Sequence, residues 1–300
     1  MTAMTEINFD DAPVERVLHL LKVEELDVDL YRGPRNPGGK GRVFGGQVIG
    51  QALMAATGSV DHDRICHSLH AYFMRAGDEN YPIIYRVERD YDGGSFSNRR
   101  VIAMQRGKPI LNMTASFQKQ ESGFEHQADM PDVPGPDELL NEQQLAASLG
   151  DAVPERLRAF FTRPRPIEMR PVTPWTPVDP KPMPPVSHIW FRAAGPTGDD
   201  QILQRAILAY ASDMSLLGTC MKPHGISWMK PGMQTASLDH AVWLHGEVKA
   251  DEWMLYATDS DWSGAGRGFN RGKIFNRKGE LIASTAQEGL IRFRADKAKG

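Results

Sequence analysis

The stretch that decides the fold is HSLHAYFMRAG at residues 67–77, because the chain repeats it later as SLDHAVWLHG at residues 237–246. When these tracts are aligned, His240 follows His70 by 170 residues. A second pair of tracts, PILNMTASFQ at 109–118 and GELIASTAQ at 279–287, recurs at an offset of 169 residues. Two tracts with nearly one offset indicate a folding unit used twice. The period is far longer than the roughly 20–50 residues of a solenoid repeat.

The composition is that of an ordinary globular protein with room for two domains. The chain has 300 residues, of which 41% are hydrophobic and 24% charged, and about 150 residues is a common domain size. The net charge of −3 gives no general basic surface for nucleic acid. The sequence contains no apolar run of about 18 residues, so we expect no membrane span.

The two ends of the chain and its cysteines favour a cytoplasmic protein. The first ten residues are acidic and lack the apolar core of a secretory signal. The last six residues do not form a Ser-Lys-Leu peroxisomal signal. Two cysteines, Cys66 and Cys220, are too few for a disulfide framework or a zinc cluster, so we expect no metal site.

The first unit shows helix signals followed by strand signals. Apolar residues at helical spacing predict an amphipathic helix over 12–24, and a Gly/Pro-rich loop follows at 32–41. The tract at 43–56 is apolar nearly all round, which predicts a buried helix. Strand-like runs follow at 66–74, 82–89, 95–106 and 109–118. A buried helix followed by antiparallel strands is an α+β pattern rather than an alternating βαβ pattern.

The second unit follows a proline-rich segment. Nine of the 21 prolines lie between Pro164 and Pro185, which predicts an extended linker over 121–187, interrupted by a short helix at 154–161. A helix is predicted at 199–211, and we expect 214–221 to be the counterpart of the buried helix of the first unit. Strand-like runs recur at 236–246, 252–260, 267–276 and 280–294. The predicted division is therefore 1–120, 121–187 and 188–300.

The familiar catalytic motifs are missing, which directs attention to isolated polar residues. The sequence contains no Gly-x-Ser-x-Gly elbow, Walker loop, Gly-x-Gly-x-x-Gly turn or His-Glu-x-x-His motif. We interpret Cys220 as a small residue on a buried helix, since buried cysteines are usually inert. The recurrence of His70 and His240 favours a structural role for both. Asp239 and His240 are adjacent on a strand, point to opposite faces, and make a poor acid–base pair.

Asp213 is the residue at which the two halves differ most. In the repeat alignment it falls opposite Phe44, in a tract without an acid. A carboxylate among apolar helix residues is costly to bury unless it is hydrogen-bonded. A catalytic carboxylate and a helix N-cap both fit this position. Ser237 and Gln287 are weaker candidates, and the match of Gln287 with Gln118 also fits a shared structural hydrogen bond.

Seven tracts, in the same order, resemble the acyl-CoA thioesterase II family. They are RVFGGQVIGQA at 42–52, GSFSNRR at 94–100, YASDMSLL at 210–217, PHG at 223–225, SLDHAVWLH at 237–245, AGRG at 265–268 and ASTAQEG at 283–289. The resemblance covers nearly the whole chain outside the proline-rich segment. It implies a double hotdog fold, in which two antiparallel sheets each wrap around a central helix within one chain.

The resemblance also implies a reaction, the hydrolysis of acyl-CoA thioesters to free fatty acid and CoA without a cofactor. The catalytic trio of the family carries over onto Asp213, Ser237 and Gln287. Asp213 would act as general base on a water that Ser237 and Gln287 aim at the thioester carbonyl. Ser237 stands where Thr is common in the family and keeps the hydroxyl. Backbone N–H groups at the start of a buried helix would stabilise the oxyanion.

The sequence also gives expectations for substrate binding and for oligomeric assembly. Arginines near the cavity mouth would bind the CoA phosphates. The candidates are Arg99, Arg100, Arg267 and Arg271, although solvated strand faces explain these residues equally well. The family resemblance and exposed sheet edges imply a homo-oligomer, and we expect acyl-CoA rather than nucleic acid as the partner.

Two other functions remain open on the sequence. A hydratase or dehydratase acting on acyl-CoA would need a histidine or an acid near Cα or Cβ of the substrate, and His67, His70 and His240 are available. A non-catalytic acyl-CoA-binding protein would share the fold without the chemistry. The presence of Asp213, Ser237 and Gln287 together argues against this last function.

Overall fold

The structure is a computed structural model in which short helices pack against a large sheet. It describes residues 12–36, 38–150, 153, 155, 158, 162–174 and 176–297. The described α-helices are α1 Pro13–Leu21, α2 Gly45–Thr57, α3 Glu142–Ser148 and α5 Gln201–Ser212. Three 3-10 segments are also described, η1 Pro136–Glu138, η3 Leu216–His224 and η4 Ala295–Lys297.

The strands form two consecutive groups along the chain. The first half of the sheet holds β1 Glu24–Asp27, β2 Leu30–Gly33, β3 Arg64–Phe73, β4 Ile83–Asp92, β5 Phe96–Gln105 and β6 Lys108–Lys119. The second half holds β7 Ile167–Pro171, β8 Val186–Ala193, β9 Met233–Ser237, β10 Asp239–Leu244, β11 Met254–Gly264, β12 Arg267–Asn276 and β13 Leu281–Phe293.

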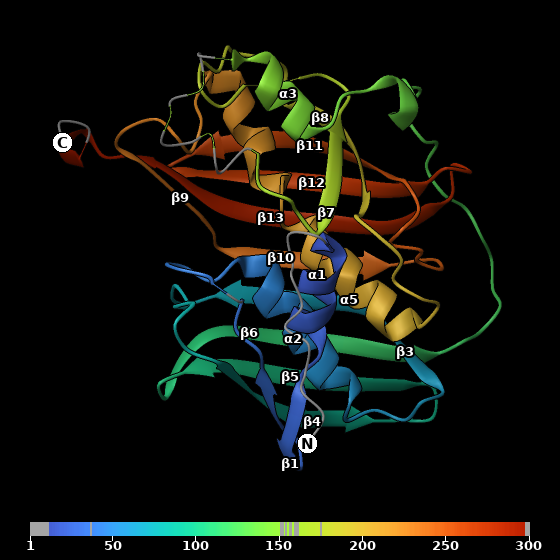
Figure 1. The fold of residues 1–300 in the computed structure, drawn as a ribbon. Helices are drawn as coiled ribbons and strands as arrows, with labels where there is room; N and C mark the ends of the chain where they lie inside the picture. The colour runs from blue at the N-terminus through green and yellow to red at the C-terminus, as the bar shows by residue number, and fades with distance from the viewer. Residues whose placement is uncertain are drawn as a thin grey trace.

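All these strands join in one antiparallel sheet. Its order is β1-β2-β4-β5-β6-β3-β10-β13-β12-β11-β8-β7, and β9 pairs with β13 outside this path. The halves meet where β3 pairs with β10, with Ala241 opposite His70 (Figure 1). The sequence β2-β4-β5-β6-β3 in one half has the same pattern as β8-β11-β12-β13-β10 in the other. The sheet is therefore continuous across the repeat.

Helices α2 and α5 pack against each other and against the sheet (Figure 1). Ten residues of α2 are buried, from Gly46 to Ala56, as the apolar tract predicted. The backbones approach closely, because a Cβ atom added to Gly46 would lie 2.2 Å from the Tyr210 carbonyl oxygen. Glycine permits this approach. No helix in the described part of the chain is long and apolar enough to cross a membrane.

The predicted helices and strands of the first half are confirmed within three residues of their bounds, although β1 and β2 were not predicted. Three larger differences follow later in the chain. The helix predicted at 199–211 is α5, and it takes the position against α2 that we had expected for 214–221. That expectation is wrong, because residues 216–224 form the 3-10 segment η3, which packs against β11, β12 and β13 instead. The strand predicted at 236–246 divides at Leu238, whose carbonyl accepts from the Phe73 N–H of the first half.

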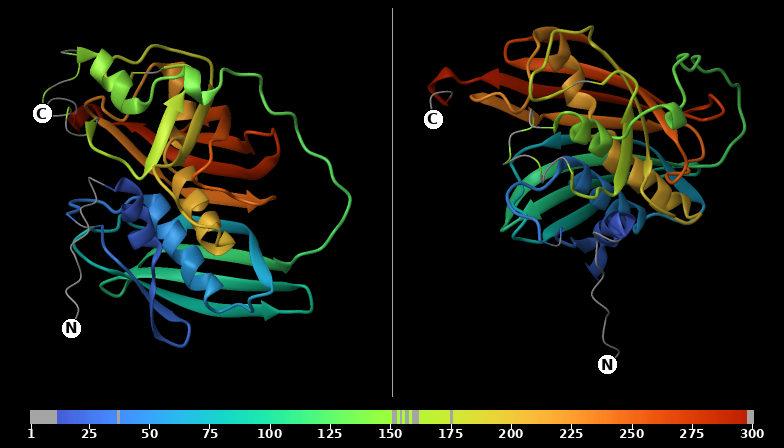
Figure 2. Two further views of the ribbon diagram at one scale, coloured as in Figure 1. Left: turned by 45° about the vertical axis from the view of Figure 1, so that its right-hand side comes forward. Right: turned by 45° about the horizontal axis from the view of Figure 1, so that its top comes forward.

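The third difference is in the segment predicted as an extended linker. After β6 the chain runs along the outside of the molecule from the first half to the second, drawn in green in Figure 2. It then forms η1 and α3 and supplies β7, which pairs with β8 and is the edge strand of the second half. The helix predicted at 154–161 lies mostly outside the described residues.

Candidate functional site

The site begins where a carboxylate of the second half meets a helix of the first. Asp213 is the C-cap of α5, and its carboxylate accepts a hydrogen bond from the Gly46 N–H at the start of α2. The N-cap of α2, Phe44, supplies no capping side chain. The first N–H groups of a helix have no partner within it, and this positive end favours an anion. Asp213 therefore caps α2 from across the molecule.

The glycine at the first position of α2 is required by this contact. A Cβ atom added to Gly45 would lie 2.6 Å from Oδ2 of Asp213 and 2.9 Å from the Phe73 ring. A larger residue would therefore push the carboxylate away from the helix. The sequence predicted this tract as a buried helix and gave no sign of its contact with Asp213.

Two side chains hold one carboxylate oxygen, Oδ1. The Ser237 hydroxyl, at the end of β9, donates to Oδ1 of Asp213 at 3.2 Å. Nε2 of Gln287, on β13, donates to the same oxygen at 2.6 Å. Ser237 is opposite Gly289 in the ladder of β9 with β13, so the pairing of these strands sets the spacing. The structure thus brings together the three residues that the sequence singled out.

The surroundings adjust the acidity of this carboxyl group. Burial raises the pKa of Asp213 to about 6, against the opposing effect of the hydrogen bonds from Gln287, Ser237 and Gly46. Loss of hydration disfavours the charged form, whereas donated hydrogen bonds favour it. The group is therefore mostly ionised at neutral pH. Its pKa lies close enough to neutrality for a general base.

A second group of polar side chains lies behind the carboxylate. His240 is 0% exposed and Gln287 1%, and Nδ1 of His240 lies 3.1 Å from Nε2 of Gln287. Nε2 of His240 lies 2.8 Å from Oγ of Ser212. Burial lowers the pKa of His240 to about 3, so its imidazole is neutral.

The two histidines matched by the repeat do not occupy equivalent places. His240 is enclosed, as expected of a core histidine. His70 is exposed on the other face of the joined strands and contacts the Trp243 ring at 4.9 Å. The reason is that inward and outward positions alternate along a strand, and the alignment of the two tracts is out of phase with this alternation.

A cavity of about 950 Å³ opens onto Asp213 and Ser237. Both halves supply its apolar walls, including Phe44, Val48, Phe73, Met169, Ile189 and Leu217. Its cationic wall residues are Arg42, Arg75, Arg165 and Lys222. Gln287 does not line the cavity and lies behind the carboxylate. The space is therefore an apolar chamber whose charged wall residues are two acids, Asp213 and Glu142, and these four cations.

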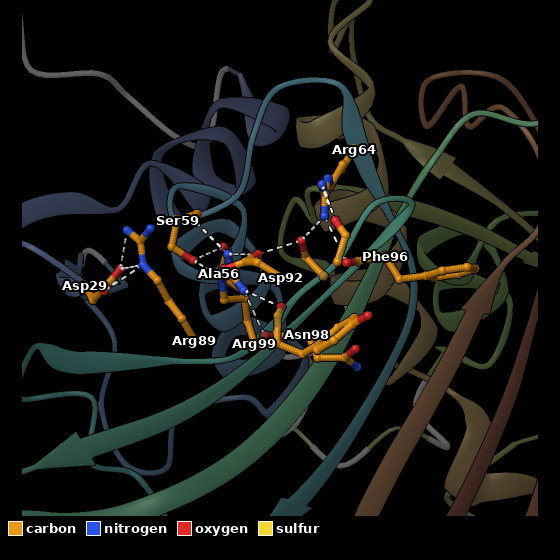
Figure 3. Close-up of polar contacts among 12 residues, drawn as sticks. Asp29, Ala56, Ser59, Arg64, Arg89, Asp92, Phe96, Asn98 and Arg99 are labelled. Atoms are coloured by element: carbon orange, nitrogen blue, oxygen red, sulfur yellow. Dashed lines mark hydrogen bonds and ion pairs between the residues drawn. The ribbon is translucent and has the colours of Figure 1, made fainter.

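The four arginines predicted for phosphate binding lie elsewhere. Arg99 is 1% exposed, and its guanidinium donates to Oγ of Ser59 at 2.9 Å and pairs with Asp92 at 2.7 Å (Figure 3). The other three are exposed and paired with acids on neighbouring strands: Arg100 with Glu88 and Asp90, Arg267 with Glu288, and Arg271 with Asp259 and Asp261. None of the four lines the cavity among the described residues.

The remaining candidates also lie outside the cavity wall. His67 is half-buried and bonds Oγ of Ser116 at 2.8 Å. Cys220 is buried in η3, and burial raises the pKa of its thiol to about 11. A thiol that is protonated at neutral pH is a poor nucleophile. The described residues of the cavity wall include none of His67, His70, His240 and Cys220.

Two kinds of residue were not predicted at this site, the enclosed His240 behind the carboxylate and the arginines of the cavity wall. The alternation of His240 with Val242 and Leu244 places His240 on the inner face of its strand, and this signal was available in the sequence. Arg42, Arg75 and Arg165 carry no comparable signal. They come from a loop, a turn and the proline-rich segment, which meet only in the folded chain.

Comparison with known proteins gives matches over nearly the whole chain. Residues 157–290 match the acyl-CoA thioesterase family and residues 32–118 match the acyl-CoA thioesterase N-terminal domain. Acyl-CoA thioesterase 2 of Haemophilus influenzae is 41% identical over 280 residues, which is 93% of this chain and 98% of that protein.

Solved structures agree with the sequence matches. The crystal structure of the acyl-CoA thioesterase II TesB2 from Mycobacterium marinum is 37% identical, with a TM-score of 0.75 over 93% of this chain and 98% of that one. A protein of unknown function with a hot dog fold from Alicyclobacillus acidocaldarius has a TM-score of 0.72 over 92% of this chain and 97% of that one. It is only 17% identical, so it bears on the fold alone. The fold is a hotdog fold.

Proposed function

This chain belongs to the acyl-CoA thioesterase family, and we propose that its Asp213 activates the water that cleaves the acyl-CoA thioester. The enzyme hydrolyses acyl-CoA to a free acid and CoA. The observation that carries the assignment of Asp213 is its carboxylate, which is held by Ser237, Gln287 and Gly46 at the wall of an apolar cavity. No other carboxylate among the described residues combines these donors with that position.

The proposed reaction proceeds through direct attack of water. Asp213 accepts a proton as the water oxygen bonds to the thioester carbonyl carbon, giving a tetrahedral oxyanion. Collapse of this intermediate breaks the C–S bond, and protonated Asp213 returns the proton to the departing CoA sulfur. Ser237 lines the cavity and donates to Asp213, so its lone pairs are free to accept from the water. Gln287 holds the carboxylate from behind.

We assign stabilisation of the oxyanion to the first turn of α2. Gly45 is the first residue of that helix and lines the cavity. An N–H group in the first turn has no partner within the helix and lies at its positive end. A donor aimed at the developing charge is worth most in a site from which water is excluded.

We propose that Arg42, Arg75 and Arg165 bind the CoA phosphates. Arg42 and Arg75 are exposed at the cavity wall, and Arg165 is half-buried there beside Glu142 at 3.3 Å. Guanidinium groups match phosphate geometry with two parallel hydrogen bonds. The apolar walls supplied by both halves would then hold the acyl chain.

We further propose that the fold is a double hotdog, with units at 1–120 and 188–300 joined by 121–187. The matching strand orders around α2 and α5 support this division. In the structure, β7 extends the second unit back into the joining segment. The expected homo-oligomer stays a prediction.

The function is tested by following CoA thiol release from acyl-CoAs of short to long chain. The wild-type enzyme should release thiol and Asp213→Ala should not, while both bind the substrate. Near-wild-type turnover by Asp213→Ala would contradict the role of Asp213. A covalent acyl group trapped on Ser237 would contradict direct attack by water.

A further inference from the structure

The orientation of the Gln287 amide needs an explanation. Its nitrogen lies 2.6 Å from Oδ1 of Asp213. An ionised carboxylate can only accept hydrogen bonds, so the NH₂ end of the amide must face it. The opposite orientation would place the amide oxygen against the carboxylate oxygen and remove a donor from the base. Turnover that uses ionised Asp213 therefore requires one of the two amide orientations.

The amide oxygen does not fix this orientation. Oε1 of Gln287 is buried and has no hydrogen-bond partner among the described residues. The NH₂ group makes both of the contacts that hold the amide, one to Asp213 and one to Nδ1 of His240 at 3.1 Å. Each of its two hydrogens can then point to an acceptor.

His240 can accept only in one tautomer. If Nδ1 accepts from Gln287, the proton must be on Nε2. Nε2 lies 2.8 Å from Oγ of Ser212, and that hydroxyl donates onward to the Ala209 carbonyl at 3.0 Å. The Ser212 oxygen is therefore available to accept from His240. Each donor in the chain from Gln287 through His240 to Ser212 has an acceptor. The hydrogen bonds therefore all run in one direction and strengthen one another.

We propose that His240 is a positioning residue whose unprotonated Nδ1 holds the Gln287 amide with its NH₂ group toward Asp213. The inference rests on the proposed function, because it concerns the same carboxylate. His240 does not line the cavity and touches no reacting atom. It acts through Gln287, and Ser212 acts through His240 by fixing the tautomer.

The groups around Asp213 determine what a pH profile reports. Gly46 faces it from α2, Ser237 from β9 and Gln287 from β13. Tyr256 of β11 is the neighbouring titratable group; its hydroxyl donates to the Ser212 carbonyl at 3.1 Å, and burial raises its pKa. The charged residues of the cavity wall are Arg42, Arg75, Glu142, Arg165 and Lys222. Substitution of His240 leaves all of these groups unchanged.

The main test compares His240→Leu with His240→Gln. Leucine offers no acceptor, so the Gln287 amide can turn and withdraw its donor from Asp213. We expect kcat to fall about tenfold at little change in KM, and the acid limb of the profile to move to higher pH, since a lost hydrogen bond disfavours the charged form. The glutamine of His240→Gln keeps an acceptor, so this variant should restore most of kcat and most of the wild-type position of the acid limb. A merely structural His240 would lower Tm in both variants and leave the acid limb of the folded enzyme in place.

A double-mutant cycle tests whether His240 acts through Gln287. In a Gln287→Ala background, His240→Leu should cause no further fall in kcat, since interacting residues are not additive. A full additional tenfold fall would overturn the proposal. Ser212→Ala provides a second variant if His240→Leu does not fold. It frees the tautomer and should move the acid limb in the same direction by less.

An NMR measurement separates this inference from the proposed function. The ¹⁵N shifts of His240, assigned by comparison with His240→Gln, should show Nδ1 unprotonated and Nε2 protonated in the wild type. A proton on Nδ1 would overturn the inference whatever the activity. Full turnover by Asp213→Asn, with the expected tautomer present, would instead overturn the role of Asp213 as base.

Discussion

The C-terminal ends of the two central helices, α5 and α2, hold matching places in the two halves but meet different side chains. After α5, the chain places Asp213 at a cavity wall with Gln287 and His240 behind it. After α2, the corresponding place is filled by Arg99, which donates to the Ser59 hydroxyl and carbonyl at 2.9 and 3.0 Å (Figure 3). One helix end presents an acid to the cavity, and the other is closed by a buried cation.

The strands below these helix ends make the comparison direct. Arg99 is on β5 and Asn270 is on β12, and these strands hold the same place in the two matching strand orders. Asn270 accepts from the Cys220 N–H at 2.8 Å, so both side chains reach the segment that follows a helix. In the first half the Arg99 side chain closes the end of α2, and in the second half Asn270 holds η3 against β12.

The largest expected effect in this comparison of the two helix ends is the loss of activity when Asp213 is replaced. Asp213→Asn should lower kcat/KM by about 10³-fold, or about 4 kcal/mol, because an amide cannot accept a proton from water. Thiol release at saturating and limiting acyl-CoA measures this change. Arg99→Met is the matched control at the other helix end, and its folded form should keep wild-type kcat. Equal losses of kcat in both variants would break the comparison.

The next effect is on stability at the closed end. Arg99→Met should reduce the free energy of unfolding by about 3 kcal/mol, because it leaves buried carbonyls and the Ser59 hydroxyl without donors. Urea unfolding of both proteins measures the difference. A variant as stable as wild type would show that Arg99 does not hold this end of α2.

Removal of one donor to the base gives a smaller effect. Ser237→Ala should lower kcat by about thirtyfold, or about 2 kcal/mol, the size of a hydrogen bond to a charged group. Ser237→Thr keeps the hydroxyl and should stay close to wild type. Steady-state kinetics of the two variants measure the change in kcat. Equal activity of the Ala and Thr variants would exclude a role for the hydroxyl.

The pH dependence of activity sharpens the assignment of the acid. Because the pKa of Asp213 is raised to about 6, kcat/KM should rise with pH up to about 6 and then level off. At pH 5 it should be roughly tenfold below the plateau, since only the ionised carboxylate is a base. An acid limb near pH 4 would mean that a different carboxylate controls the rate.

The pH dependence of stability should have the opposite sign to that of activity. The pKa of Asp213 rises from 3.8 to about 6 on burial, so between these values the folded protein binds more protons than the unfolded chain. Stability contributed by this group is therefore lost as pH rises through that window. Unfolding of wild type and Asp213→Asn at pH 4.5 and 7 measures it, and identical changes in both would contradict the raised pKa.

Much of the architecture could be predicted because it depends on local patterns. The alternating strands of both halves and the apolar helix α2 appear in the sequence within a few residues of their observed bounds. The helix assignment near 214–221 failed because the repeat offset was applied across an unequal connection. Residues 58–63 join α2 to β3, whereas residues 213–238 join α5 to β10 and include η3 and β9.

The trio at the site could be named from the family resemblance, but its geometry could not. Nothing local shows that Asp213 caps α2, because Gly46 lies far away in the sequence. Arg99 was expected near the cavity mouth as a ligand of the CoA phosphates. Its burial depends on Ser59 and the Tyr91 and Asn98 carbonyls, which meet it only in the folded sheet.

The shared ladder between β3 and β10 makes the two halves a single cooperative unit. Separating them would break five residue pairings, from Asp239 with Tyr72 to Trp243 with Ser68, and would also part α2 from α5 and the Asp213 carboxylate from its helix. Subglobal opening that releases one half alone therefore exposes an unpaired strand edge and apolar helix surface at once. We therefore expect the duplicated chain to unfold in one transition, with neither half acting as a foldon on its own.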